Sequence, residues 1–144
     1  MKKWMAFILS AIFLTGVSAH AGNFTDNGND TVTDNNTGLA WQKTEGGAMA
    51  WESAISYCKT LSLAGQSGWR LPNKRELMSI VNYGKNNPAI DTASFPNANS
   101  SLYWSSTTTA GGASSAWYVD FYLGGVSYND KSHDSYVRCV RGGQ

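Results

Sequence analysis

A hydrophobic side chain recurs every three or four positions in one segment of the chain. The residues of this apolar face are Trp51, Ala54, Ile55, Cys58 and Leu61. Such spacing predicts an amphipathic helix, because these positions lie on one side of a helix with about 3.6 residues per turn. Gly65 follows soon after the pattern ends, and glycine readily adopts the left-handed conformation that terminates many helices. The helix is therefore expected to end near Gly65.

A second, shorter helix is predicted just after Pro72. The proline holds the preceding residues 69–71 in an extended conformation. Asn73 stands three residues before Glu76, which is the spacing of a capping box with Asn as its first residue. The helix is expected to end near Gly84. The residues that it would bury are Leu77, Ile80 and Val81.

Short strands are predicted on both sides of these helices. Residues 31–33 and 39–41 lie between turns rich in Asn, Asp and Gly. In the C-terminal third, apolar and polar residues alternate, and Gly124-Gly125 allows a tight turn in a hairpin with one buried face. The strands predicted there span residues 102–106, 117–123, 126–128 and 136–141. Small residues at 107–115 predict a linker, and residues 85–101 a long ordered loop.

The order of these elements predicts an α+β fold, with two helices, mixed or antiparallel short strands and a long loop. Composition and charge then limit the kind of protein that has this fold. The chain has 144 residues, of which 42% are hydrophobic, and this suits one domain with its own core. The formal net charge is +1, so the clustered cations that nucleic-acid phosphates require are absent from the sequence. No nucleic-acid partner is expected.

The N-terminus has the pattern of a secretory signal. Lys2-Lys3 precedes an apolar run at residues 5–17, and Ala19-His20-Ala21 is a small-x-small cleavage site. We predict that residues 1–21 are removed and that residues 22–144 form one domain, secreted or periplasmic in the cell envelope. The apolar run is too short to span a bilayer comfortably and no later stretch is long enough, so no membrane span is expected after signal removal.

Two cysteines remain in the mature chain, Cys58 and Cys139. An even number of cysteines in an oxidising compartment favours a bridge over free thiols. We therefore predict a Cys58–Cys139 disulfide. It would tie the first helix to the last strand and, since it closes a long loop, would stabilise the fold chiefly by restricting the unfolded chain.

This order of helices, loop and strands resembles the C-type lectin fold. Six motifs resemble more specifically those of the Legionella collagen-like (Lcl) C-terminal domain family, over residues 24–141. The motifs lie at residues 29–43, 51–54, 69–73, 103–107, 116–121 and 136–141. The resemblance implies a bacterial envelope or secreted domain of C-type-lectin-like fold, in a family whose members are implicated in adhesion and in binding sulfated glycosaminoglycans.

No cofactor is expected. Animal C-type lectins bind calcium and sugar through Glu-Pro-Asn or Gln-Pro-Asp with Trp-Asn-Asp, and none of these tripeptides occurs. Asp26, Asp30 and Asp34 superficially resemble a calcium loop, but Gly28 stands where a ligand is expected, which favours carboxylates that form turns. Calcium would need a site built differently, and no metal-binding residue is assigned.

No catalytic residue is assigned either. His133 is the one histidine after the predicted cleavage site, and its neighbour Asp134 would point away from it on a strand. A solvated loop histidine is the simpler interpretation. A hydrolase centred on His133 is the least favoured of the functions considered.

The aromatic residues divide into two sets. Trp41, Trp51, Trp69, Trp104 and Trp117 stand at apolar positions of the pattern and are predicted to lie in the core. Near the C-terminus, tyrosines alternate with hydrogen-bonding side chains, a composition that suits sugar or protein recognition but also an ordinary solvated hairpin. The predicted ligand-binding residues are Tyr118, Asp120, Tyr122, Tyr128, Asn129, Asp130, Lys131, His133, Asp134, Tyr136 and Arg138. Arg138 either belongs to this face or pairs with Asp120 across the sheet.

These observations predict an exported bacterial binding module without catalysis, for adhesion or glycan recognition through the C-terminal hairpin and loop. The expected partner is a glycan or a cell-surface protein, and the oligomeric state is left open. The alternative is a protein-binding or structural envelope module. The Asn, Ser, Tyr, Asp and His content of residues 118–136 also suits a protein diversified by a retroelement.

Overall fold

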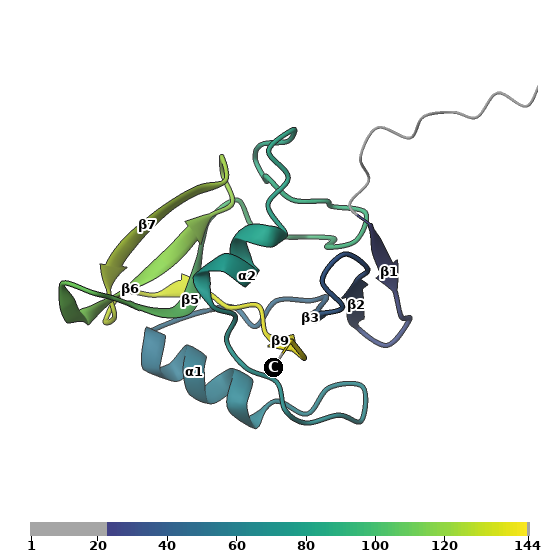
Figure 1. Cartoon of the computed structure of the whole chain (residues 1–144), viewed down its shortest axis with the longest axis horizontal. Coiled ribbons are helices and arrows are strands. Elements are labelled where there is room, and N and C mark those ends of the chain that lie inside the picture. The colour runs from purple at the N-terminus through teal and green to yellow at the C-terminus, as the bar shows by residue number, and fades with distance from the viewer. Residues whose placement is uncertain (1–22, 144) are drawn as a thin grey trace, which may run out of the picture.

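The computed structural model describes residues 23–143, and the predicted signal peptide at 1–21 lies outside them. The described residues form two helices and nine short strands in two sheets, so the α+β class is confirmed (Figure 1). In chain order the elements are β1 Phe24–Asp26, β2 Thr31–Asp34, β3 Ala40–Gln42, β4 Ala48–Met49, α1 Trp51–Thr60, α2 Lys74–Ser79, β5 Leu102–Thr109, β6 Gly112–Asp120, β7 Gly125–Asp130, β8 Ser135–Tyr136 and β9 Val140–Arg141. None of the helices within residues 23–143 has the length and apolar character needed to cross a membrane.

The C-terminal segment of the chain contributes one strand to each of the two sheets. The four-stranded sheet has the order β1-β2-β3-β9, and the five-stranded sheet the order β4-β8-β5-β6-β7. Neighbouring strands are antiparallel, except that β5 and β8 are parallel. The prediction of one strand at 136–141 is therefore wrong. Tyr136 belongs to β8 and Val140–Arg141 form β9, while residues 137–139 lie between them, where the chain passes from one sheet to the other.

The core lies on both faces of the five-stranded sheet. Tyr103 and Trp104 are consecutive residues of β5, so their side chains point to opposite faces. Tyr103 packs in one core cluster with Val119 and residues of α2. Trp104 packs in the other with Ala116 and residues of α1. The hairpin at residues 117–128 was predicted to bury one face, but Val119 of β6 lies in the first cluster and Tyr118 packs against the second, so both faces of β6 contact the core.

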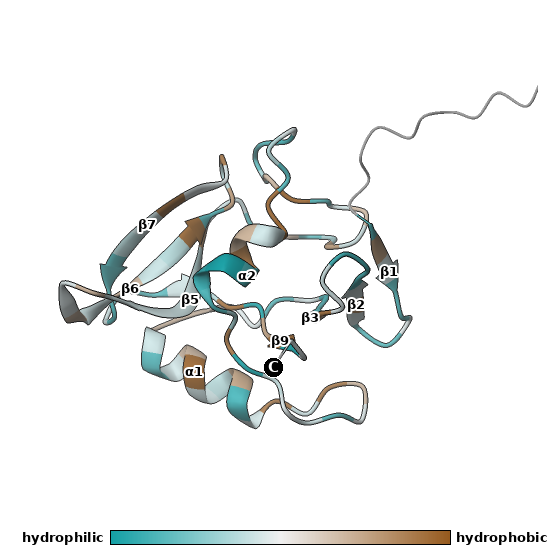
Figure 2. Ribbon diagram, in the orientation of Figure 1, coloured by the Kyte–Doolittle hydropathy of each residue, from teal (hydrophilic) through white to brown (hydrophobic). Residues whose placement is uncertain are grey.

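The first helix, α1, packs its apolar face against the sheet, and Cys58 is fully buried. Figure 2 shows hydrophobic segments of its ribbon between hydrophilic ones. The helix ends just before Leu61, which is extended, rather than near Gly65. Gly65 instead has a φ of +68° in the tight turn between the bridge partners Leu63 and Gln66.

The predicted disulfide is confirmed. The sulfur atoms of Cys58 and Cys139 are 2.03 Å apart, and their Cα atoms 5.5 Å. The bridge connects α1 to the segment between β8 and β9. It therefore fixes the helix to the point where the chain passes between the sheets.

The second helix, α2, begins as predicted. Asn73 accepts a hydrogen bond from the backbone N–H of Glu76, and the Glu76 carboxylate accepts one from the backbone N–H of Asn73, so the capping box is confirmed. Leu77 and Ile80 are buried. The helix ends before Ile80, well short of the predicted Gly84.

Residues 107–115 form the outer part of the β5–β6 hairpin, so the prediction of a linker is wrong. The two strands pair from Leu102 opposite Asp120 to Thr109 opposite Gly112, with irregular register near the turn. Residues 85–101 contain neither helix nor strand, which confirms the predicted loop.

Candidate functional site

A groove lies beside the β5–β6 turn, near the β7 edge of the five-stranded sheet. Its volume is about 490 Å³. The lining residues are Thr109, Ala110, Gly111, Gly112, Ser114, Ser115, Trp117 and Tyr128. Small residues of the hairpin end thus supply one part of the lining, and two aromatic side chains supply the other.

Trp117 and Tyr128 form the aromatic part of the groove. They are register partners on β6 and β7, so their side chains lie on the same face of the sheet. Their ring centroids are 5.5 Å apart and their planes meet at 78°, an edge-to-face contact. Tyr128 is 59% exposed, and Trp117 is half-buried. The prediction that Trp117 belongs to the core is therefore only partly right, because part of its side chain lines the groove.

Lys74 restrains the indole of Trp117 from the helix side. Its Nζ lies 4.0 Å from the ring centroid, a cation–π contact. Its backbone N–H also donates a hydrogen bond to the hydroxyl of Thr107 at 3.0 Å. The start of α2 is thereby attached to β5 directly behind the groove.

Hydroxyl groups supply the polar part of the lining. The Thr109 hydroxyl donates to the carbonyl of Gly112 at 2.6 Å and so stabilises the turn. Ser114 and Ser115 add two further hydroxyls, each able both to donate and to accept a hydrogen bond.

No charged side chain of the described residues lines the groove. One charge of each sign lies nearby, Lys74 over the Trp117 ring and Asp130 opposite Ser115 in the β6–β7 register. Hydrogen bonds from the hydroxyl and the backbone N–H of Ser132 lower the pKa of Asp130. Asp130 is therefore ionised near neutral pH and holds the turn after β7.

The predicted ligand-binding residues do not form one surface. Tyr128 lies in the groove, but Tyr118 and Asn129 belong to the opposite face, because side chains alternate along β6 and β7. Tyr122 is 49% exposed in the turn between these strands, where its backbone N–H donates to the carboxylate of Asp120. The hairpin thus presents different residues to different sides.

The polar residues after β7 lie at the far end of the hairpin from Tyr122. Lys131 places its Nζ 3.8 Å from the centroid of the Trp51 ring, on the α1 side of the sheet. His133 and Asp134 are exposed beyond it. Within residues 23–143, no group of three His, Cys, Asp or Glu side chains could hold a metal ion.

Two predicted residues are partly or fully withdrawn from solvent. Tyr136 is half-buried, with its ring centroid 5.5 Å from that of Tyr103. Arg138 is only 1% exposed. The expectation that Arg138 lies on the ligand-binding face is corrected, because burial removes its guanidinium from solvent.

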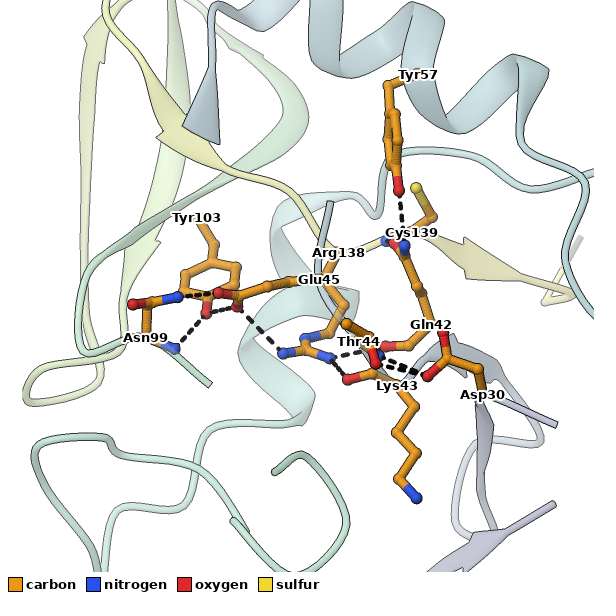
Figure 3. Close-up of polar contacts among 10 residues, drawn as sticks. All are labelled: Asp30, Gln42, Lys43, Thr44, Glu45, Tyr57, Asn99, Tyr103, Arg138 and Cys139. Atoms are coloured by element: carbon orange, nitrogen blue, oxygen red, sulfur yellow. Dashed lines mark hydrogen bonds and ion pairs between the residues drawn. The ribbon is translucent and has the colours of Figure 1, made fainter. Parts of the chain in front are cut away.

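Figure 3 shows what holds the buried guanidinium of Arg138. It donates hydrogen bonds to the backbone carbonyls of Gln42, at 2.7 Å, and Lys43, and it lies 3.4 Å from the carboxylate of Glu45. Glu45 in turn accepts a hydrogen bond from the hydroxyl of Tyr103. Arg138 therefore connects the segment after β3 with β5 and does not pair with Asp120 across the sheet.

The family of the chain follows from one comparison. The family model described as the Lcl C-terminal domain matches residues 30–141, more than three quarters of the chain. The chain belongs to the Lcl C-terminal domain family. The matched region holds both cysteines, Arg138 and the whole groove, whereas β1 precedes it. No curated protein matches the chain.

In this Lcl C-terminal domain, sequence reasoning missed most of the groove. Trp117 was expected in the core, and the small residues at 107–115 in a linker. Lys74 received no role, because its cation–π contact joins segments far apart in the sequence. The expected turn at Gly124-Gly125 would have placed Ser132 opposite Trp117, whereas the turn lies at residues 121–124 and places Tyr128 there.

Proposed function

We propose that this Lcl C-terminal domain is an exported bacterial binding module that recognises a neutral glycan through the groove at Trp117 and Tyr128, without catalysis. The observation that carries the proposal is the arrangement of two edge-to-face aromatic rings beside hydroxyl-bearing residues, in a groove without charged lining. Adhesion to a glycan-bearing surface is the role that such a site would serve.

The chemistry of the groove matches that of a sugar ring. A pyranose has an apolar face of C–H groups, which carry partial positive charge and favour the negative face of an aromatic ring. Its edges carry hydroxyls, which can exchange hydrogen bonds with Ser114 and Ser115. A neutral sugar also brings no charge that the groove would have to compensate. The sulfate groups of a polysulfated chain would find only one nearby cation to pair with, Lys74.

Export and a C-type-lectin-like fold belong to the same proposal. The Cys58–Cys139 disulfide supports an oxidising compartment, where such bridges persist. Two helices, the loop at 85–101 and the antiparallel C-terminal hairpins support the lectin-like fold. In this view residues 22–144 are the exported domain.

A binding role is preferred to catalysis because of where the acid–base groups lie. His133 and Asp134 are both exposed at the end of the hairpin, whereas catalytic groups act best where water is excluded. The groove also offers no carboxylate from its lining residues to bind calcium, a cation that takes oxygen ligands from Asp and Glu. Glycan binding is therefore expected to be independent of calcium.

A glycan array with purified protein tests the proposal, once with calcium and once with chelator. We expect saturable binding to one class of neutral glycan, equal under both conditions. Tyr128→Ala should weaken this binding about tenfold, the effect of losing one aromatic contact. Leu123→Ala is the matched control, because Leu123 is 64% exposed on the same hairpin outside the groove.

Two results would contradict the proposal. One is the absence of glycan binding by folded protein, together with saturable binding to a purified envelope protein. The other is equal loss of glycan binding in Tyr128→Ala and Leu123→Ala, which would place the site elsewhere on the hairpin.

A further inference from the structure

A second cleft lies between the four-stranded sheet and the segment that follows α2, away from the Trp117 groove. Its volume is about 490 Å³. The lining residues are Asn23, Phe24, Asp34, Asn36, Ser79, Ile80, Val81, Asn82, Tyr83, Gly84 and Asp91. We call it the Asp34 cleft. Asn23 and Phe24 precede the region matched by the family model, so the cleft depends on residues outside that match.

The cleft is built by two turns that face each other. Phe24 pairs with Asp34 at the ends of β1 and β2, which brings both residues to one corner of the sheet. On the other side, the backbone N–H of Asn82 donates to the carbonyl of Ala89 at 2.9 Å and so closes the segment after α2. Tyr83 is 69% exposed in that segment.

Asp34 is a buried carboxylate without a counter-charge. It is 3% exposed and accepts hydrogen bonds from the backbone N–H of Asn36, at 2.9 Å, and from the hydroxyl of Thr37, at 2.7 Å. No ion pair within residues 23–143 includes it. Buried charges in proteins are normally paired, since desolvation of an unpaired charge is costly.

The other carboxylate of the cleft, Asp91, accepts hydrogen bonds from the backbone N–H of Ala93, at 3.3 Å, and from the hydroxyl of Ser94, at 2.6 Å, but its charge is only weakly compensated. Asp91 is 5% exposed. The nearest cation is the Nζ of Lys85, 3.9 Å away on a side chain that is 46% exposed. The lining itself contributes two carboxylates and no Lys or Arg. The cleft is therefore complementary to a cation.

The apolar part of the lining indicates which chemical class of cation would fit the cleft. Phe24 and Val81, which are both half-buried, offer a surface for an aliphatic chain. The ring of Tyr83 offers a face that attracts a positive charge or its adjacent C–H groups. We propose that the Asp34 cleft binds a primary ammonium group on a short aliphatic chain, the chemistry of a lysine side chain. This ligand class and site are separate from the proposed glycan groove.

Three probes of equal length test the proposal on the purified protein: pentylammonium, 1-pentanol and pentanoate. Chemical shifts of the Asn82 and Gly84 backbone amides report occupancy by NMR. We expect saturable shifts with pentylammonium, about tenfold weaker binding of pentanol, and no binding of pentanoate. Because the probes share their chain, the difference measures the ammonium group alone.

Asp34→Asn removes the charge and should weaken pentylammonium about tenfold while leaving pentanol unchanged. Asp26→Asn is the matched control, since Asp26 is an exposed carboxylate on the same sheet that already pairs with Lys43. Tyr83→Ala provides a second variant in case Asp34→Asn fails to fold, and it should also weaken pentylammonium. Equal affinity for pentylammonium and pentanol, or no binding of either, would overturn the proposal. So would unchanged pentylammonium affinity in folded Asp34→Asn.

Discussion

The guanidinium of Arg70 binds both carboxylate oxygens of Glu76, with Nη1–Oε1 and Nη2–Oε2 distances of 2.7 Å each. Arg70 also exchanges backbone hydrogen bonds with Val140 of β9 and donates to the carbonyl of Gly142. Glu76 meanwhile completes the capping box with Asn73. One bidentate pair thus connects the start of α2 to the end of the chain.

Acid should weaken this connection. Burial raises the pKa of Glu76, but the hydrogen bonds from Arg70 and the Asn73 backbone outweigh it, so the pKa lies below its usual value. A carboxyl whose pKa is lowered by folding stabilises the protein above the unfolded value and loses that contribution as pH falls through the folded value. Glu76→Gln should therefore lower the free energy of unfolding at neutral pH and reduce its loss in acid.

Urea unfolding at a series of pH values between about 3 and 7 measures this effect. Glu52→Gln is the control, because Glu52 is an exposed acid in the first turn of α1. A Glu76→Gln variant with the same pH dependence as the native protein would show that protonation of Glu76 contributes nothing to the loss of stability in acid.

Loss of the disulfide should destabilise the fold strongly. The bridge joins residues separated by 81 positions, for which the chain-entropy model gives roughly 4 to 5 kcal/mol as an upper figure. Cys58→Ser and Cys139→Ser should lower the melting temperature by similar amounts. A reductant should lower the melting temperature of the native protein too, but not that of either variant. Calorimetry measures the shift. Two reactive thiols in the native, untreated protein would contradict the bridge.

A methyl group at Gly124 should be far more costly than one at Gly125. Gly124 has a φ of +85°, and a Cβ there would lie 2.7 Å from the Val81 Cγ1 and 3.2 Å from the Tyr83 ring. Gly125 has open space around the same position. We expect Gly124→Ala to lower the free energy of unfolding by about 1 to 3 kcal/mol and Gly125→Ala to change it by less than about 0.5. Equal effects in urea unfolding would argue against close packing at this turn.

Local signals in the sequence predicted local structure well. The Asn73–Glu76 spacing specified a capping box, because both partners lie within one helical turn. The cysteine pair specified the disulfide, since only one intramolecular pairing exists for two cysteines. The helix spacing likewise placed Cys58 on the buried side of α1.

Features that depend on tertiary contacts were not predictable in this way. The β5–β6 hairpin end is built from Gly, Ala, Ser and Thr, whose hydropathies do not alternate strongly enough to indicate a strand. Arg138 looked like a surface residue because a charged side chain is seldom buried. Its partners, the carbonyls of Gln42 and Lys43, carry no side-chain signal and lie on a distant segment.

Arg138 should tolerate neither lysine nor methionine. Burial lowers the pKa of its guanidinium, yet an arginine stays protonated because its ordinary pKa is so high. Its planar donors reach the carbonyls of Gln42 and Lys43 and the carboxylate of Glu45 together. A lysine ammonium is a compact point charge and cannot reproduce this fork, and methionine would leave Glu45 without its cation.

We expect Arg138→Met to lower the free energy of unfolding by about 3 to 5 kcal/mol, as for other buried pairs that lose one partner. Arg138→Lys should lower the free energy of unfolding by a smaller amount, because lysine keeps the charge but not the geometry. Arg75→Lys is the control, since Arg75 is exposed on α2. Urea unfolding of the three variants gives the comparison. If Arg138→Lys were as stable as Arg75→Lys, the forked geometry of the guanidinium would contribute nothing beyond its positive charge.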